Sequence, residues 1–358
     1  MKKINLELVN GDKAVLVEDQ KVKILKSENY NFLFDKSNGF FARWGKTQED
    51  DGDFSIGFPE IADIEISTIC SGIYKPCKFC YKSNTPTGEY MTLDTFAKVF
   101  AKLPPTITQI AFGIGDIDGN PDLWKIMEFC RSNGVVPNIT INGARMTPEY
   151  FDNLAKYCGA VAVSVYDKDL TYDAIQELTN RGMRQINIHY MISEETIDMA
   201  YEVMNDMKND PRLARMNAIV FLSLKTKGNA KKGFTQLSQE KFNALSEYAI
   251  ENYVRIGFDS CSSFKFFASL DQNKKLTEDF RKKMYECVEP CESSVYSSYI
   301  NTEGKYFPCS FCENVDGWDG LDVLAADDFI KDIWYNEKTV EFRNKLLNCK
   351  RDCPIYNI

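Results

Sequence analysis

The chain has 358 residues, 44% of them hydrophobic, which is typical of a soluble globular protein with one large core and a smaller domain. A net charge of −9 gives no general attraction for phosphate backbones, so nucleic acid is not an expected partner. No apolar run is long enough for a membrane helix, and twelve cysteines without a secretory signal favour a reducing cytoplasm and metal ligation over disulfides.

Residues 1–58 are expected to form a β-rich extension. Strands are predicted at 4–8, 13–17 and 22–25 from their alternating or continuous apolar residues. A turn is predicted at Asn10-Gly11, and an acidic tract at Gln48–Asp53 leads into the next segment. The extension is expected to cover the larger domain that follows it.

Three cysteines, Cys70, Cys77 and Cys80, follow a β-branched run at 61–66 that predicts a strand. Thiolates at this spacing can hold three irons of a 4Fe–4S cluster and leave the fourth iron open to a substrate or cofactor. A structural zinc site needs four ligands, and no fourth cysteine or histidine lies nearby in the sequence. The alternative is a zinc knuckle completed by a distant ligand, but the spacing favours a catalytic iron–sulfur loop.

Between residues 92 and 258, helix-like and strand-like segments alternate. Helices are predicted at 92–102, 123–133, 148–157, 170–181, 194–208 and 238–251, and strands at 107–112, 138–141, 160–166, 185–191, 218–224 and 254–258. Repeated units of this size indicate a parallel sheet with right-handed crossovers, closing into a full or partial barrel. Function in such a barrel lies where the strands end, and the cysteine loop follows the first of them. Cys130 falls within a predicted helix and Cys158 directly follows one, and both are expected to be core thiols.

A second group of thiols lies after the barrel. Its members are Cys287, Cys291, Cys309, Cys312, Cys349 and Cys353. Strand-like segments at 295–300 and 305–307 flank a glycine turn, so a hairpin is expected to bring Cys291 and Cys309 together. Two cysteine pairs are also a common zinc pattern, and the residues alone leave a zinc ribbon and an iron–sulfur site equally open.

The three-cysteine loop, with Phe79 between its last two cysteines and Tyr81 behind them, resembles the loop of the radical S-adenosylmethionine (SAM) enzymes. The first gap of the loop has six residues here and usually three in that family. The resemblance extends over residues 60–353 and implies an α/β fold with a partial (β/α)6 TIM-like barrel at 59–265. It also implies a 4Fe–4S cluster on the three cysteines, where reductive cleavage of bound SAM gives a 5′-deoxyadenosyl radical for C–H activation.

The same resemblance assigns five residues to the SAM cofactor. The segment after the second strand lines up with the family's Gly-Gly-Glu-Pro segment, which puts Gly115 and Asp116 beside the amino group of the SAM methionine. The first glycine and the glutamate of that segment are replaced in this chain. Asn142 would face the ribose and Ser164 the methionine carboxylate, and Tyr81 completes the expected cofactor-binding set.

Residues 266–358 resemble the SPASM and twitch extensions of many radical SAM enzymes. The spacing from Cys291 through Gly304 to Cys309 matches their pattern, which implies an auxiliary 4Fe–4S cluster and disfavours the zinc ribbon. The expected ligands are four of Cys291, Cys309, Cys312, Cys349 and Cys353, with Cys349 the least favoured. A denser cysteine block that marks the full SPASM pattern is absent, so one auxiliary cluster is expected rather than two.

Three further residues at the barrel rim have open roles. Cys261 follows the last predicted strand and is a catalytic candidate, because some radical SAM peptide epimerases quench the substrate radical with a thiol hydrogen atom. The alternatives are an auxiliary-cluster ligand or an inert buried thiol. His189, the one histidine, is expected to be a satisfied core or rim residue, and Lys225 a solvated rim lysine.

The leading functional hypothesis is a radical SAM enzyme that modifies a ribosomally made peptide by epimerisation, crosslinking or dehydrogenation. Oxidation or rearrangement of a small molecule, such as a sugar or nucleoside, is the alternative reaction. The alternative of another class is a non-catalytic metal-binding interaction protein. A peptide substrate and a reductant such as flavodoxin or ferredoxin are the expected partners. The N-terminal extension lacks the helices of a winged-helix leader-binding domain, so a covering role is preferred over leader binding.

Overall fold

The computed structural model describes residues 2–7, 11, 13–47, 57–356 and 358. Leu8, Asn10 and the acidic tract at Gln48–Asp53, which carry parts of the predictions above, lie outside the described residues. Among the described residues, none of the helices has the length and apolar character needed to cross a membrane.

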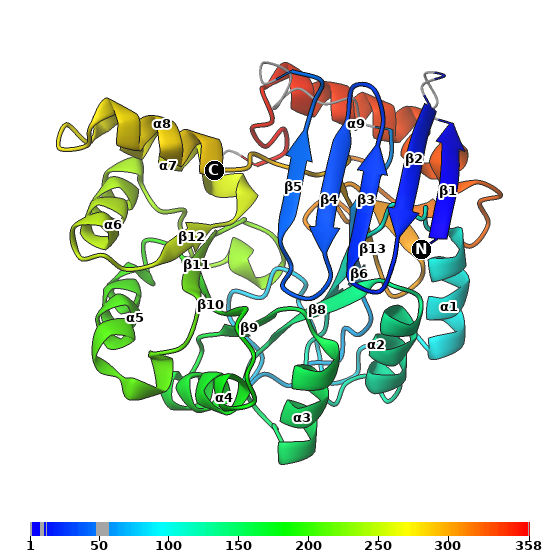
Figure 1. The fold of residues 1–358 in the computed structure, drawn as a ribbon. Coiled ribbons are helices and arrows are strands. Elements are labelled where there is room, and N and C mark those ends of the chain that lie inside the picture. Colours follow the sequence, from blue (N-terminus) through cyan, green and yellow to red (C-terminus); the bar gives the residue numbers. More distant parts are fainter. Residues whose placement is uncertain (1, 8–10, 12, 48–56, 357) are drawn as a thin grey trace.

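A parallel sheet forms the centre of residues 57–356. Its strands are β6 (Ile61–Glu65), β7 (Gln109–Gly113), β8 (Val136–Ile141), β9 (Val161–Ser164), β10 (Ile186–Ile192), β11 (Ala218–Ser223) and β12 (Ile256–Phe258), paired in that order. The helices between them are α1 (Leu93–Lys102), α2 (Leu123–Ser132), α3 (Pro148–Tyr157), α4 (Lys168–Asn180), α5 (Ile197–Asn209) and α6 (Gln239–Glu251). Figure 1 shows these helices around the outside of the curved sheet. The fold is therefore the expected partial (β/α)6 barrel, with β12 added as a further strand.

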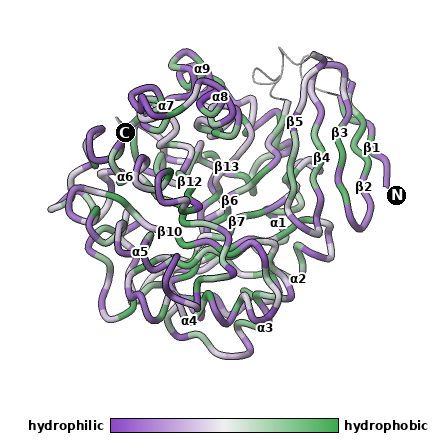
Figure 2. Tube along the Cα trace, turned by 60° about the vertical axis from the view of Figure 1, so that its left-hand side comes forward, coloured by the Kyte–Doolittle hydropathy of each residue, from purple (hydrophilic) through white to green (hydrophobic). Residues whose placement is uncertain are grey.

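Local sequence signals account for these elements. Thr92, Thr147 and Ser238 each accept a hydrogen bond from the third residue of the helix that they precede, at α1, α3 and α6. β10 alternates between fully buried and half-buried residues, with Ile186, Ile188 and other apolar side chains in the core. Figure 2 shows the strands as mainly hydrophobic and the surrounding helices as mixed. The core thus lies between the sheet and its ring of helices.

The C-terminal segment continues the same sheet rather than starting a new one. β13 (Ser297–Ile300) pairs in parallel with β6, and β14 (Lys305–Phe307) and β15 (Leu321–Asp322) follow it in antiparallel register. The remaining elements are α7 (Ser263–Gln272), α8 (Glu278–Cys287), a π-helix at Phe329–Trp334 and α9 (Glu337–Asn348). The predicted hairpin at 295–307 is confirmed. Because β13 is parallel to β6, the turn of this hairpin lies at the carboxyl end of the parallel sheet.

The N-terminal extension is an antiparallel sheet, as predicted. Its strands β1 (Lys2–Glu7), β2 (Lys13–Glu18), β3 (Val22–Lys26), β4 (Asn31–Asp35) and β5 (Phe41–Trp44) pair in chain order. Leu16, Leu25 and Phe32 are buried in the same core cluster as the barrel residues. The buried ammonium of Lys23 donates to the carbonyl oxygens of Pro105 (3.2 Å) and Ile107 (2.6 Å). This sheet therefore packs on the barrel, as Figure 1 also shows.

Candidate active site

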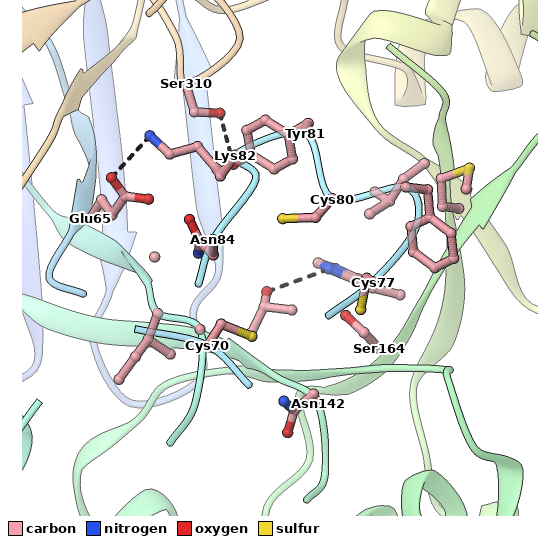
Figure 3. A pocket seen from close by; sticks show the side chains of 18 of the residues that line it. Glu65, Cys70, Cys77, Cys80, Tyr81, Lys82, Asn84, Asn142, Ser164 and Ser310 are labelled. Carbon is pink, nitrogen blue, oxygen red and sulfur yellow. Dashed lines mark hydrogen bonds and ion pairs between the residues drawn. The ribbon is translucent and has the colours of Figure 1, made fainter. Parts of the chain in front are cut away.

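The cysteine loop lies where β6 ends, at the carboxyl end of the parallel sheet. Cys70, Cys77 and Cys80 all line a cavity of about 440 Å³, which we call the first cavity. Figure 3 shows the three side chains around one space, with Asn142 and Ser164 beside it. The topology thus brings the loop to strands β8 and β9, which lie far from it in the sequence.

Backbone contacts hold this loop in place. The amide of Cys70 donates to the carbonyl of Thr85 at 2.9 Å. From the segment after β11, Asn229 donates its backbone amide to the carbonyl of Cys80 (2.9 Å) and its side-chain amide to that of Cys77 (3.2 Å). Gly228 has a φ of +57° and a Cβ there would lie 2.3 Å from a loop carbonyl. Sequence reasoning missed this anchor, whose only signal was a glycine after a strand.

The three thiols are donors of the type that holds an iron–sulfur cluster. Within the described part of the chain, no three His, Cys, Asp or Glu side chains are arranged to hold one metal ion. In a 4Fe–4S cluster each thiolate binds a different iron, so the thiols surround a larger group. Burial and then the neighbouring Cys70 and Cys80 raise the pKa of Cys77 to about 11. Metal binding at this loop must therefore displace thiol protons.

The structure brings four of the five expected SAM residues together. Gly115, Asn142, Ser164 and Tyr81 line the first cavity along with the cysteines. The Asp116 carboxylate lies behind the loop instead, where it accepts the backbone amide of Ser71 at 2.8 Å and pairs with Arg145. In this arrangement Asp116 supports the cysteine loop from outside the first cavity.

Gly115 is expected to be essential for the shape of the loop. A Cβ at this position would lie 2.3 Å from the carbonyl oxygen of Ile69 and 2.5 Å from Cβ of Cys70. We expect Gly115→Ala to displace Cys70 and to lower the iron bound by the loop severalfold, measured by iron analysis of anaerobically purified protein. The control is Gly257→Ala, because a Cβ there would meet only Val220 at 3.8 Å. Equal iron contents in the two variants would contradict this account.

The other side of the first cavity carries a buried cluster of charges. Lys82 pairs with Glu65 at 2.9 Å, donates to the hydroxyl of Tyr299 at 2.9 Å and also pairs with Glu313. Tyr299 donates to Glu65 at 3.0 Å. Burial raises the pKa of Glu65, against the opposing effect of Lys82. This cluster ties the cysteine loop to β13 and to the loop after β14, and Figure 3 shows its Lys82–Glu65 pair.

A second cavity, of about 220 Å³, adjoins the first and is rich in thiols. Its lining includes Cys261, Cys291, Cys309, Cys312 and Cys353. The sulfur atoms of Cys309 and Cys312 are 3.3 Å apart, and the hydrogen bond from the Cys312 thiol lowers the pKa of Cys309. The backbone amide of Cys291 donates to the carbonyl of Arg351 at 3.2 Å, which brings the C-terminal turn to this cavity.

The sequence leaves the roles of Cys349 and Cys261 open, and their positions bear on those roles. Cys349 does not line the second cavity, and its sulfur lies 3.2 and 3.0 Å from the carbonyl oxygens of Leu346 and Asp352. Cys261 lines the second cavity and not the first. A hydrogen-atom donor would need access to the first cavity, so this placement favours a role on the auxiliary side.

Lys225 and His189 both face the first cavity. The expectation of a solvated rim lysine is wrong, because Lys225 is buried and pairs with Asp259. His189 is close to the hydroxyl of Thr140, at 3.4 Å, and burial lowers its pKa to about 4. The imidazole is therefore neutral at physiological pH, in agreement with a satisfied core or rim residue.

Comparison with known structures supports the fold. The chain is similar to Streptococcus suis SuiB, at 12% identity and a TM-score of 0.63 over 89% of this chain and 88% of that one. SuiB bound to its precursor peptide SuiA gives 12% identity, a TM-score of 0.65 and coverages of 95% and 90%. The chain is also similar to native anSMEcpe with bound AdoMet and Cp18Cys peptide, at 15% identity and a TM-score of 0.53 over 79% of this chain and 82% of that one. No curated protein matches the chain in sequence.

A sequence profile for the radical SAM superfamily matches residues 64–184. The matched segment begins in β6 and contains the cysteine loop, Gly115, Asn142 and Ser164. These are the residues that the fold gathers around the first cavity. Residues 64–184 accordingly form a radical SAM domain, and the chain is an enzyme.

Proposed function

We propose that this radical SAM enzyme modifies a peptide, with an auxiliary 4Fe–4S cluster in the second cavity. The observation that carries the proposal is that the first cavity has an open cleft on one side and the thiol-rich cavity on another. An open cleft suits an extended chain, whereas a small metabolite needs only an enclosed pocket. The peptides bound to SuiB and to anSMEcpe support the same substrate class.

The cleft begins at the buried charge cluster. It has a volume of about 450 Å³ and shares Glu65, Tyr81, Lys82 and Asn84 with the first cavity. The rest of its lining is mostly polar, including Lys227, Lys231, Asn301, Thr302, Glu303 and Glu313. Polar groups along such a cleft can hydrogen-bond a peptide backbone, while one side chain of the substrate enters the first cavity.

The residues of the chain supply binding and protection. Cys70, Cys77 and Cys80 would hold the SAM-binding cluster, and Gly115, Asn142, Ser164 and Tyr81 would position the SAM. When bound and reduced, this cofactor pair supplies a 5′-deoxyadenosyl radical that removes a hydrogen atom from the substrate. Phe79, Tyr166, Phe112 and other apolar side chains line the cavity and keep water away from that chemistry.

For the auxiliary cluster we favour Cys291, Cys309, Cys312 and Cys353 as ligands, with Cys261 as the fifth thiol of the cavity. All five face one space, whereas Cys349 bonds to backbone carbonyls. Full cysteine ligation would close the cluster to substrate, which is suited to electron transfer rather than to SAM binding. The C-terminal part, at 266–358, would then act as the auxiliary domain of the barrel.

Iron analysis tests the auxiliary cluster. Wild-type protein purified anaerobically is expected to hold about eight irons, and the Cys309→Ala/Cys312→Ala variant about four, since each cluster has four. Cys287→Ala is the control, because this cysteine is exposed and lines neither cavity. Wild-type protein that holds only about four irons together with stoichiometric zinc would contradict the iron–sulfur assignment of the second cavity.

Deuterium transfer tests the substrate class. Peptides translated from short reading frames beside the gene are made fully deuterated and incubated with the enzyme, SAM and reduced flavodoxin. The expected result is deuterium in 5′-deoxyadenosine together with a mass change in one peptide. Deuterated sugars and nucleosides are the parallel arm. Transfer from those compounds and from none of the peptides would favour the small-molecule alternative instead.

A further inference from the structure

Lys225 and Asp259 lie between the two thiol-lined cavities. Lys225 follows β11 and Asp259 follows β12, and these strands are neighbours in the sheet. Both side chains line both cavities, as do Ser310 and Phe311 of the Cys309–Cys312 loop. The side chain of Lys225 is only 2% exposed. A buried ammonium–carboxylate pair thus forms part of the wall between the candidate active site and the candidate auxiliary site.

The two charges of this pair face different neighbours. Asp259 is tied to the barrel, because its carboxylate accepts the backbone amide of Ser223 at 3.3 Å and the hydroxyl of Ser262. The Lys225 ammonium lies 4.8 Å from the centre of the Phe311 ring, and it lines the second cavity together with Cys261. Both groups line the second cavity, and the ammonium is the one that contacts the Phe311 ring of the Cys309–Cys312 loop.

The charge on Lys225 persists in this environment. Burial alone would lower the pKa of Lys225, but Asp259 and Cys261 outweigh it and the net pKa is raised. The ammonium shares the second cavity with Cys353 as well as with Cys261. Its field thus reaches thiols from two separate segments of the chain.

We propose that Lys225 is a positioning residue that raises the reduction potential of the cluster held in the second cavity. The inference rests on the proposed function, because it requires the auxiliary cluster. A cluster gains one negative charge on reduction, and a buried cation nearby stabilises the more negative state. Because the Lys225 side chain is buried, the solvent screens this interaction less than that of a surface lysine.

The test uses full-length protein that carries Cys70→Ala, Cys77→Ala and Cys80→Ala, so that the remaining iron belongs to the second cavity. The reduction potential is measured by titration with electron paramagnetic resonance detection. Lys225→Met removes the charge and keeps the length of the side chain. Lys225→Arg keeps the charge, and Asp259→Asn removes only the counter-charge. Lys23→Met is the matched control, since Lys23 is also buried and ion-paired but lines neither cavity.

We expect Lys225→Met to lower the equilibrium constant for reduction at least tenfold, about 59 mV for one electron. Lys225→Arg and Lys23→Met should retain the parent potential, and Asp259→Asn should raise it. An unchanged potential in Lys225→Met with iron intact would overturn this inference and leave the proposed function standing. A folded parent protein that binds no iron would overturn both this inference and the proposed function with its auxiliary cluster. If Lys225→Met loses its iron, an unchanged potential in Asp259→Asn overturns the inference and a raised potential supports it.

Discussion

Cys77→Ala is expected to reduce the formation of 5′-deoxyadenosine to the level seen without enzyme. Cys77 lies in the first cavity with Cys70 and Cys80, and two thiolates cannot hold a cluster that needs three. The variant should also lose about four irons, because the loop can no longer retain its cluster. The measurement is chromatographic detection of 5′-deoxyadenosine after incubation with SAM and dithionite.

Cys130→Ala is the matched control for this experiment. Cys130 is buried in α2 and lies outside both cavities, so the substitution removes a thiol without touching the proposed ligands. The Cys130→Ala variant should retain its iron content and its cleavage of SAM, although the substitution leaves a small cavity in the core. Equal activity in Cys77→Ala and Cys130→Ala would exclude the cysteine loop as the site of SAM cleavage.

The second large effect is expected from Lys82→Met, on stability. The substitution leaves Glu65 and Glu313 without their shared cation, and their side chains are only 6% and 13% exposed. Removing one partner of a buried ion pair typically costs about 3–5 kcal/mol of unfolding free energy. The measurement is urea unfolding followed by circular dichroism, compared with wild type under the same anaerobic conditions.

The pH dependence of this loss has a definite sign. Burial already raises the pKa of Glu65, and loss of Lys82 raises it further. A carboxyl group whose pKa is higher in the folded state lowers stability as the pH rises through the interval between its two pKa values. Because the two unfolded states titrate alike, the deficit of Lys82→Met relative to wild type should grow as the pH rises from the folded-state pKa of Glu65 in wild type to its higher pKa in the variant. Below that interval the deficit should shrink, because Glu65 is then protonated in both folded proteins.

Lys98→Met provides the contrast. Lys98 pairs with Asp94 on α1, but the side chains are 65% and 76% exposed. Such surface pairs contribute about 0.3–0.5 kcal/mol, so this variant should unfold almost like wild type at every pH. A loss of similar size in both lysine variants would show that the buried cluster adds nothing special to stability.

Local patterns in the sequence determined the barrel and the first three N-terminal strands, but not β4 and β5. The strand predicted at 185–191 is β10 (Ile186–Ile192), and the helix predicted at 148–157 is α3 (Pro148–Tyr157). Apolar periodicity and capping residues act over a few neighbours, so they can be read from one stretch of chain. The cysteine loop was recognisable for the same reason, because its three thiols lie within eleven residues.

The tertiary structure alone decided which distant groups meet. Cys261 joins the second cavity and Cys349 stays outside it, although the sequence left both open as possible ligands. Lys225 is buried against Asp259, and Asp116 turns toward Ser71 and Arg145 instead of the first cavity. These outcomes depend on the pairing of β13 with β6 across more than 200 residues and on side-chain directions at strand ends. Neither is encoded in local periodicity, because each is set by packing partners that are remote in sequence.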